Sequence, residues 1–81
     1  METVEEYIKA HQKMLGLYLF LRRKELGLSQ REVAEKSGVR RGEISEIEVG
    51  SNINPQFETL LKLLYALGLR LDFTAEEASE E

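Results

Sequence analysis

The stretch from Ser29 to Gly50 constrains the fold of this 81-residue chain more than any other segment. Ser29 and, three residues later, Glu32 form an S-x-x-E capping box, which marks the start of a helix. Gly38 follows, and glycine readily takes the left-handed backbone that ends a helix. A second apolar run then begins and stops at Gly50. The pattern predicts two helices of about eight residues joined by a short turn.

Apolar residues in this stretch indicate which sides of the two helices face a core. Val33 and Ala34 are expected to point inward from the first helix. Ile44 and Ile47, three residues apart, should do the same in the second. Two short helices joined by a turn of about 3–4 residues are typical of the helix-turn-helix motif, whose second helix enters the DNA major groove. Residues 40–49 would be that recognition helix.

These residues and several others carry a resemblance to a known family. Over roughly Leu15 to Phe73, the chain resembles the phage-repressor (XRE-type) helix-turn-helix family. The matching residues are Leu28-Ser29-Gln30, Val33-Ala34, Gly38-Val39, Ile44-Ser45, Ile47-Glu48 and Gly50. Downstream, Asn54-Pro55 and the runs 58–64 and 66–69 resemble the last helix and terminal strand of HigA-type and HipB-type antitoxins. The resemblance implies a sequence-specific DNA-binding repressor, and further an antitoxin of a toxin–antitoxin pair that autoregulates its operon.

The resemblance also implies which residues contact bases. The family reads bases mainly from the positions occupied here by Arg41, Gly42, Glu43 and Glu46. Arg41 can bond bidentately to guanine O6 and N7, and a carboxylate can accept from cytosine N4. Gly42 has no side chain and allows close approach. The two acids also repel phosphates, which opposes strong binding.

A second set of residues is expected at phosphates. In the family, the glutamine at position 30 contacts a phosphate and braces the recognition helix, and an amide at a helix N-terminus suits an anionic oxygen. Glu48 matches a position that usually makes a structural bond, and we expect it to be scaffold. The other expected phosphate contacts are Arg40, Ser45, Arg22 and Arg23.

The distribution of charge supports a DNA partner, although the net charge is −4. Four of the fifteen acids lie within residues 76–81, and residues 1–75 carry eleven acids and eleven bases. Between Arg22 and Arg41, seven bases accompany three acids. This positive segment is the one that the motif would turn toward DNA. The alternative is a solvated surface of mixed charge.

Composition excludes several other classes. The length fits one domain with a modest core, which oligomerisation would supplement. There are no cysteines, so disulfides, cysteine metal sites and thiol nucleophiles are absent. The longest apolar run, Leu17 to Leu21, is too short to span a membrane, and the acidic start resembles no signal peptide. We expect a cytoplasmic protein with no cofactor, no metal and no enzymatic site, and assign His11 no catalytic role.

Residues 3–26 show one long helical pattern. Thr3 and Glu6 form a capping box, and apolar residues recur three or four apart up to the stop at Gly27. Gly16 either allows close approach of another helix or marks a break between residues 3–14 and 15–26. The sequence leaves open whether 3–14 continues the helix or folds back.

Five consecutive apolar residues at 17–21 go all round this helix, and a small domain cannot bury them all. We therefore expect Leu17, Phe20 and Leu21 to form a partner surface, where a toxin could bind. The alternative is burial between the N-terminal extension and the fourth helix.

The C-terminal third predicts a helix and then a strand. Asn54 would be the N-cap and Pro55 the first helical residue. The expected apolar stripe of this helix consists of Phe57, Leu60, Leu61, Leu64 and Leu67. Leu63 is expected to lie outside the stripe. Residues 69–73 alternate apolar and charged side chains, which indicates a strand that pairs with a second subunit. Its interface residues would be Leu69, Leu71 and Phe73; the alternative is a loosely packed tail.

Together these features predict an all-α fold, a small lambda-repressor-like bundle of four to five helices with a helix-turn-helix, plus one short strand paired across a homodimer. We divide the chain into a helical extension (1–14), a DNA-binding domain (15–68), a dimerisation strand (69–74) and a flexible acidic tail (75–81). The expected partners are a two-fold symmetric DNA operator, a second copy and a toxin, with no membrane. The alternative function is a protein-interaction module of the same fold that does not bind DNA.

Overall fold

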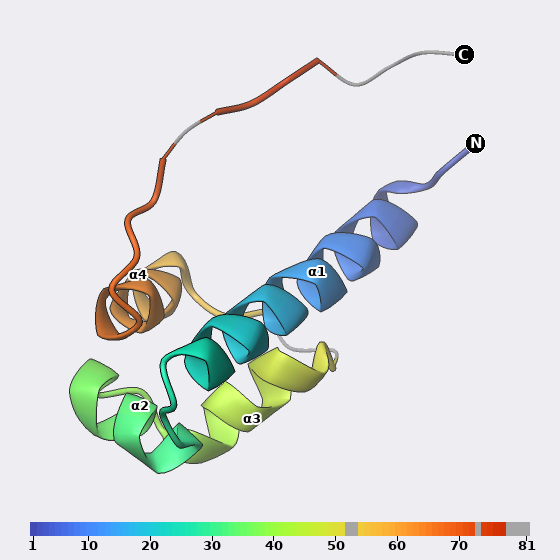
Figure 1. Cartoon of the computed structure of the whole chain (residues 1–81). Coiled ribbons are helices and arrows are strands. Elements are labelled where there is room, and N and C mark those ends of the chain that lie inside the picture. The colour runs from blue at the N-terminus through green and yellow to red at the C-terminus, as the bar shows by residue number, and fades with distance from the viewer. Residues whose placement is uncertain (52–53, 73, 78–81) are drawn as a thin grey trace.

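A computed structural model describes residues 1–51, 54–72 and 74–77. This part of the chain contains four helices: α1 (Val4–Glu25), α2 (Gln30–Ser37), α3 (Arg41–Val49) and α4 (Phe57–Ala66). α3 packs along α1, and α2 packs against both α3 and α4 (Figure 1). The fold is all-α, as the sequence predicts. In the described ranges, no helix is both long enough and apolar enough to cross a membrane.

α1 begins and ends as expected. The Thr3 hydroxyl accepts from the Glu6 N–H at 3.1 Å, and the Thr3 N–H donates to the Glu6 carboxylate at 2.9 Å, which completes the capping box. The helix then continues to Glu25 without a break. Residues 3–14 therefore continue the first helix and do not fold back on it.

The two helices of the motif are also delimited as expected. Ser29 accepts from the Glu32 N–H at 3.0 Å, and its own N–H donates to the Glu32 carboxylate at 2.8 Å. α2 ends at Gly38, whose φ of 80° is a left-handed conformation that a Cβ disfavours. The turn to α3 spans residues 38–40.

One apolar core forms where the C-terminal half of α1 meets the three shorter helices. Leu19 is the apolar side chain that α1 buries there. Val33, Ile44 and Ile47 are each at most 3% exposed, which confirms the inward orientation that the sequence predicts. The core is completed by Val39, Leu63, Leu64, Ala66 and Leu67.

α4 begins later than predicted. Asn54 is not its N-cap and Pro55 is not its first residue: the N-cap is Gln56, with an extended backbone (φ −67°, ψ 152°). Pro55 is half-buried and borders a small hollow beside Leu15 and Ile47. Because Gln56 takes this extended backbone, the helix starts only at Phe57.

The buried face of α4 also differs from the predicted stripe. Leu63 is 2% exposed, whereas Phe57 is 59% and Leu61 40% exposed. Leu60, Leu63, Leu64 and Leu67 satisfy the same i, i+3, i+4, i+7 spacing as the expected set. This leucine-rich helix therefore offers two overlapping stripes, and packing against α2 selects one of them.

The segment after α4 forms no strand within residues 69–72 and 74–77. The Leu69 N–H donates to the Leu64 carbonyl at 2.8 Å, and the Leu69 side chain packs against the core. Leu71 is exposed, while Phe73 and residues 78–81 lie outside the described residues. The strand is thus not confirmed. Because it needs a second chain to pair with, its pairing stays a prediction.

Gly16 lies where α1 crosses α3. It is buried, and a Cβ built on it would meet the backbone carbonyl oxygens of Ile47 and Glu48, the second at 2.9 Å. The sequence left two roles open for Gly16. In the structure it allows the close approach of α3, and it does not break α1.

We predict that Gly16→Ala destabilises the fold. Overpacking a tight contact costs about 1–3 kcal/mol, and here the obstacle is backbone, which cannot rotate away as a side chain can. This cost exceeds the roughly 1 kcal/mol that alanine gains over glycine inside a helix. Urea unfolding followed by circular dichroism should give a midpoint below that of the wild type.

Gly42→Ala is the matched control, since a Cβ built at Gly42 has no described heavy atom within 4 Å outside its chain neighbours and the nearby backbone of its own helix. Its stability should be unchanged or higher by up to about 1 kcal/mol. A Gly16→Ala protein as stable as the wild type would show that α1 and α3 do not approach as closely as described.

Candidate nucleic-acid interface

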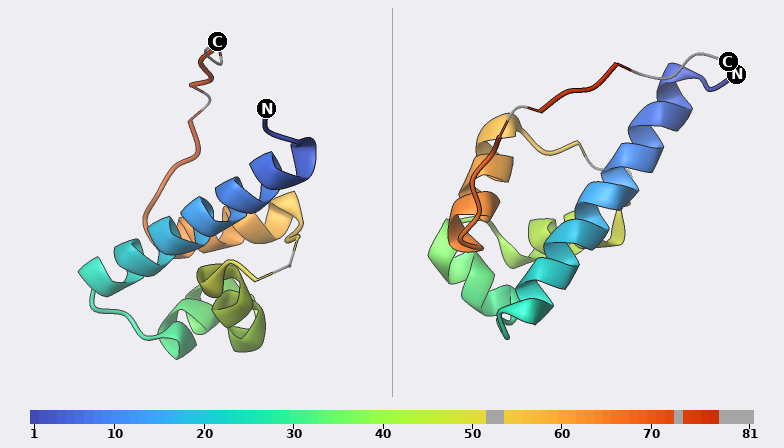
Figure 2. Two further views of the ribbon diagram at one scale, coloured as in Figure 1. Left: turned by 90° about the vertical axis from the view of Figure 1, so that its right-hand side faces the viewer. Right: turned by 45° about the horizontal axis from the view of Figure 1, so that its top comes forward.

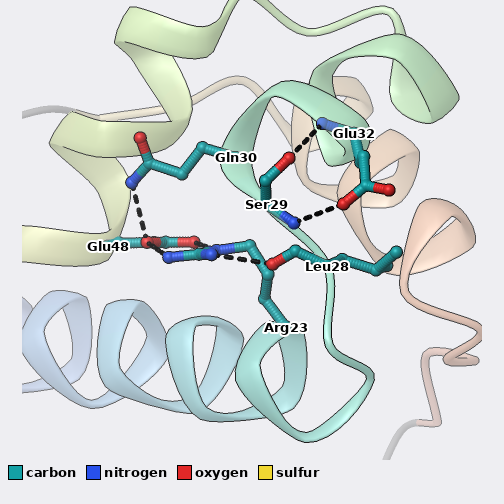
Figure 3. A network of polar contacts seen from close by, with 6 residues as sticks. All are labelled: Arg23, Leu28, Ser29, Gln30, Glu32 and Glu48. Carbon is teal, nitrogen blue, oxygen red and sulfur yellow. Dashed lines mark hydrogen bonds and ion pairs between the residues drawn. The ribbon is translucent and has the colours of Figure 1, made fainter.

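A buried ion pair fixes the position of α3 (Figure 3). Arg23 of α1 donates from Nε and Nη2 to the two carboxylate oxygens of Glu48 in α3, at 2.7 and 3.0 Å. Gln30 of α2 donates its side-chain amide to the same carboxylate at 3.0 Å. Three helices are thus joined at one carboxylate, which makes Glu48 part of the scaffold, as expected.

The Arg23 guanidinium is fully engaged within the domain. Its Nη1 donates to the Leu28 carbonyl at 2.9 Å, and its central carbon lies 5.5 Å from the centre of the Phe20 ring. The hydrogen bond to Glu48 raises the pKa of Arg23, against the opposing effect of burial. Bidentate geometry of this kind allows a buried ion pair to offset its desolvation.

The opposite side of α3 faces solvent. Arg40, Arg41, Gly42 and Glu46 are exposed, and Glu43 is half-buried. Within the described part of the chain, the charged side chains of this set form no hydrogen bond or ion pair, and no side chain caps the start of α3. The structure therefore brings the expected base-contact residues together on one polar surface.

A shallow depression adjoins this surface at the end of α1 and the starts of α2 and α3. Its volume is about 720 Å³. Three exposed cations border it: Lys24, Arg31 and Arg41. Glu32 also borders it, and hydrogen bonds with the Ser29 backbone and hydroxyl lower the pKa of Glu32, which keeps it ionised. Arg23 is neutralised by Glu48, so three cationic side chains and one acidic side chain remain around this hollow. We call it the basic depression.

Arg22, expected at a phosphate, points to α4 instead. Its Nε donates to the Leu67 carbonyl at 3.1 Å, and its Nη1 pairs with Glu25 at 3.2 Å. Successive residues of a helix point about 100° apart. Of the three consecutive bases at 22–24, one therefore contacts α4, one enters the α1–α3 junction and one borders the basic depression.

Lys24 and Arg31 are functional candidates that sequence reasoning did not assign. Both belong to the positive segment between Arg22 and Arg41, so the charge count contained the signal. It could not select Lys24 over its two basic neighbours, because that choice depends on how α1 is rotated against the core.

The structure divides the expected partner surface of α1 between two flanks. Leu17 and Phe20 lie on the flank that faces α3, where they border a hollow with Ser45. Leu21 lies on the other flank, beside Leu69. Leu17 and Leu21 are each more than half exposed, so the apolar run does go round the helix as expected.

The chain's one histidine, His11, lies on the exposed part of α1. Its Nδ1 is 2.8 Å from the Tyr7 carbonyl oxygen, and its ring centre is 4.1 Å from that of Tyr7. Within the described ranges, no group of three or more histidine or carboxylate side chains is placed to hold a metal ion.

A family model described as Helix-turn-helix matches residues 19–73, which include the end of α1 and all of α2, α3 and α4. The chain therefore belongs to the XRE-type helix-turn-helix family. The family resemblance that the sequence carries is confirmed.

Known proteins are similar to the chain, including the following two. One, from Haemophilus influenzae, is named as an uncharacterized HTH-type transcriptional regulator and is 49% identical over 53 residues, or 65% of this chain and 53% of that protein. The chain thus spans about half the length of this relative. The other is the crystal structure of the restriction-modification controller protein C.AhdI from Aeromonas hydrophila. It matches with a TM-score of 0.71 and 33% identity, over 75% of this chain and 91% of that one.

We predict that Glu48→Ala strongly destabilises the domain. Removing one partner of a buried ion pair leaves an uncompensated charge and costs about 3–5 kcal/mol, and both side chains here are at most 10% exposed. Chemical denaturation should therefore show a large loss of unfolding free energy.

Glu46→Ala is the control for this experiment. It removes a carboxylate from the exposed side of the same helix and should change stability by no more than about 0.5 kcal/mol. Similar small losses for both variants would contradict the central role of the ion pair.

Proposed function

We propose that this chain is a DNA-binding transcriptional regulator that acts by inserting α3 into the major groove, without catalysis. The observation that carries the proposal is the division of α3 into two sides. Ile44, Ile47 and Glu48 hold the inner side, while the outer side presents polar groups that bond to nothing within the described chain. Base recognition requires such a helix, rigidly supported and unsatisfied on one side. The similarity to a protein named as a transcriptional regulator adds support.

Arg41 is the residue that we assign to base recognition, because a guanidinium can bond bidentately to guanine O6 and N7. Gly42 beside it allows the helix to approach the base edges closely. Glu43 and Glu46 can each accept a hydrogen bond from cytosine N4. These four residues stay the proposed base contacts.

Phosphate contacts are assigned to the residues around the basic depression. Lys24 and Arg31 border it. Gln30 stands at the start of α2, where a helix N-terminus favours an anionic oxygen. Its amide nitrogen donates to Glu48 but carries a second hydrogen, which can donate to a phosphate. Arg40 precedes the base-reading residues and Ser45 lies between Glu43 and Glu46, and these two residues complete the proposed set. Arg22 and Arg23 are left out of it because their guanidinium groups bond inside the domain.

We further propose that the protein is a repressor that binds a two-fold symmetric operator as a homodimer. Half-sites would lie about 34 Å apart or at a multiple of this distance, so that both α3 helices enter the groove on one side of the DNA. Leu69, Leu71 and Phe73 are the proposed pairing strand, which would add to the same strand of a second copy.

For the biological role, we propose an antitoxin that represses its own operon. The resemblance of residues 54–69 to HigA-type and HipB-type antitoxins supports it. Leu17 and Leu21, which are more than half exposed, and the half-buried Phe20 are apolar residues that a toxin could cover. The similarity to a restriction-modification controller favours a second role, control of a restriction–modification system. Both roles use the same DNA-binding surface.

A protein-interaction module without DNA binding is the competing class of function. The exposed apolar residues of α1 and the acids Glu43 and Glu46 on α3 favour it. The salt dependence of binding distinguishes a DNA-binding regulator from a protein-interaction module. DNA binding weakens steeply as salt rises, with a slope set by the number of phosphates engaged, whereas an apolar interface responds little.

Fluorescence anisotropy with the DNA upstream of the chain's own gene, against scrambled DNA at low and moderate salt, tests the proposal. We predict specific binding that falls steeply with salt. Arg41→Ala should lose about 1–3 kcal/mol of preference for the upstream DNA. Lys24→Ala should weaken binding to both DNAs equally. It should also reduce by about one the slope with which the logarithm of affinity falls against the logarithm of salt concentration.

Lys62→Ala is the control, since it removes a positive charge from α4, outside the proposed contacts, where Lys62 pairs with Glu58 at 3.4 Å. It should leave both affinities unchanged. If Arg41→Ala weakens binding to both DNAs equally, Arg41 contacts only phosphate. A wild type that binds neither DNA at low salt would reject the regulator in favour of the interaction module.

A further inference from the structure

Six exposed residues form a line along the whole of α1. They are spaced alternately three and four residues apart, as in the a/d seam of a two-helix coiled coil. In order they are Val4, Tyr7, His11, Met14, Tyr18 and Leu21, and we call them the α1 stripe. Its five apolar members are 53–73% exposed. An apolar line of this length marks a surface that another chain covers.

The first two turns of α1, residues 4–11, have no core to pack against within the described chain. Residues 1–11 are all exposed, and this end of the helix projects beyond α2, α3 and α4 (Figure 2). Helices in water depend mainly on packing for their stability. The match to the family model begins at residue 19, so the projecting part lies outside the region shared with the family.

The α1 stripe is complementary to itself in one antiparallel register. Val4 and Leu21 are symmetric about the point between residues 12 and 13, and so are Tyr7 and Tyr18. The remaining two stripe residues, His11 and Met14, share the same centre. A two-fold axis at this point would set each stripe residue opposite a stripe residue of the second copy, and all of them would be covered at once.

The charges at the two ends of α1 favour the antiparallel orientation. Its first turn is acidic, with Glu5 and Glu6, and its last turn is basic. An antiparallel pair places the acidic turn of one copy beside the basic turn of the other, and also opposes the two helix dipoles. A parallel pair would bring like charges together.

The α1 stripe lies on the flank of α1 away from the proposed DNA contacts. Tyr18 and Leu21 border a hollow with Leu69, whereas Leu17 on the other flank borders the hollow that contains Ser45. A second copy on the stripe would leave the outer side of α3 uncovered. It would also adjoin the segment that begins at Leu69.

We propose that the α1 stripe binds the α1 stripe of a second copy of this chain, as an antiparallel helix pair with its two-fold axis between residues 12 and 13. The inference rests on the homodimer of the proposed function and adds the helix that holds it together. This pair covers the apolar line that a single chain leaves in water.

Disulfide trapping tests this register, because the chain contains no cysteine of its own. Tyr7→Cys and Tyr18→Cys chains are mixed and mildly oxidised, and the products are separated on non-reducing gels and mapped by mass spectrometry. We expect the mixed disulfide to exceed either self-disulfide at least about tenfold, since Cα atoms more than about 7 Å apart cannot be bridged without backbone movement. Both positions are more than half exposed, so the fold should persist, which circular dichroism verifies.

Lys9→Cys mixed with Tyr18→Cys is the control, because Lys9 lies on the side of α1 opposite to the stripe and should give only background cross-linking. Dominant self-disulfides would overturn the antiparallel register. A wild-type chain that sediments as a monomer would overturn the second copy as the occupant of the stripe. Binding to the upstream DNA is measured separately. A monomer that binds this DNA contradicts the inference and the proposed homodimer, but leaves the DNA-binding regulator standing. A trapped dimer that does not bind DNA contradicts only the regulator.

Discussion

The bidentate ion pair between Arg23 and Glu48 is the interaction on which the arrangement of this small domain depends. α3 has nine residues and would not be a stable helix alone, so neighbouring helices must hold it. The pair ties it to α1, and Gln30 ties α2 to the same carboxylate. The close crossing at Gly16 brings the backbone of Glu48 against α1 and makes this contact possible. All of these bonds use the inner side of α3.

Because the inner side carries the support, the outer side of α3 and the basic depression beside it stay available to DNA. Different sides of α1 likewise carry different contacts. One side holds Leu19 and Arg23 in the core, while Lys24 borders the basic depression. A third side carries the α1 stripe and is proposed to meet a second copy. A single long helix can thus connect recognition of DNA with assembly of a dimer, without either surface covering the other.

Local sequence signals predicted much of this structure. The capping boxes at Thr3 and Ser29, the stop at Gly38 and the inward isoleucines of α3 each depend on residues a few positions apart. Features that depend on packing between helices were not predictable in this way. α4 begins at Phe57 and not at Pro55, because Gln56 stays extended. The leucine-rich α4 offers two apolar faces, of which packing selects one. The rotation of α1 against the core decides which of three consecutive basic residues reaches solvent. The sequence therefore predicted phosphate contacts at Arg22 and Arg23, whereas the structure favours Lys24.

The most direct test of the central claim, that the outer side of α3 and the basic depression form the DNA-binding surface, is an NMR titration of the isotopically labelled protein with its upstream DNA. We predict that amide signals shift for Ser29 to Arg31 and for Arg41 to Glu46, while those of Val4 to Met14 stay in place. Shifts confined to α1, or no shifts at any DNA concentration, would contradict it and show that this side of α3 does not bind DNA.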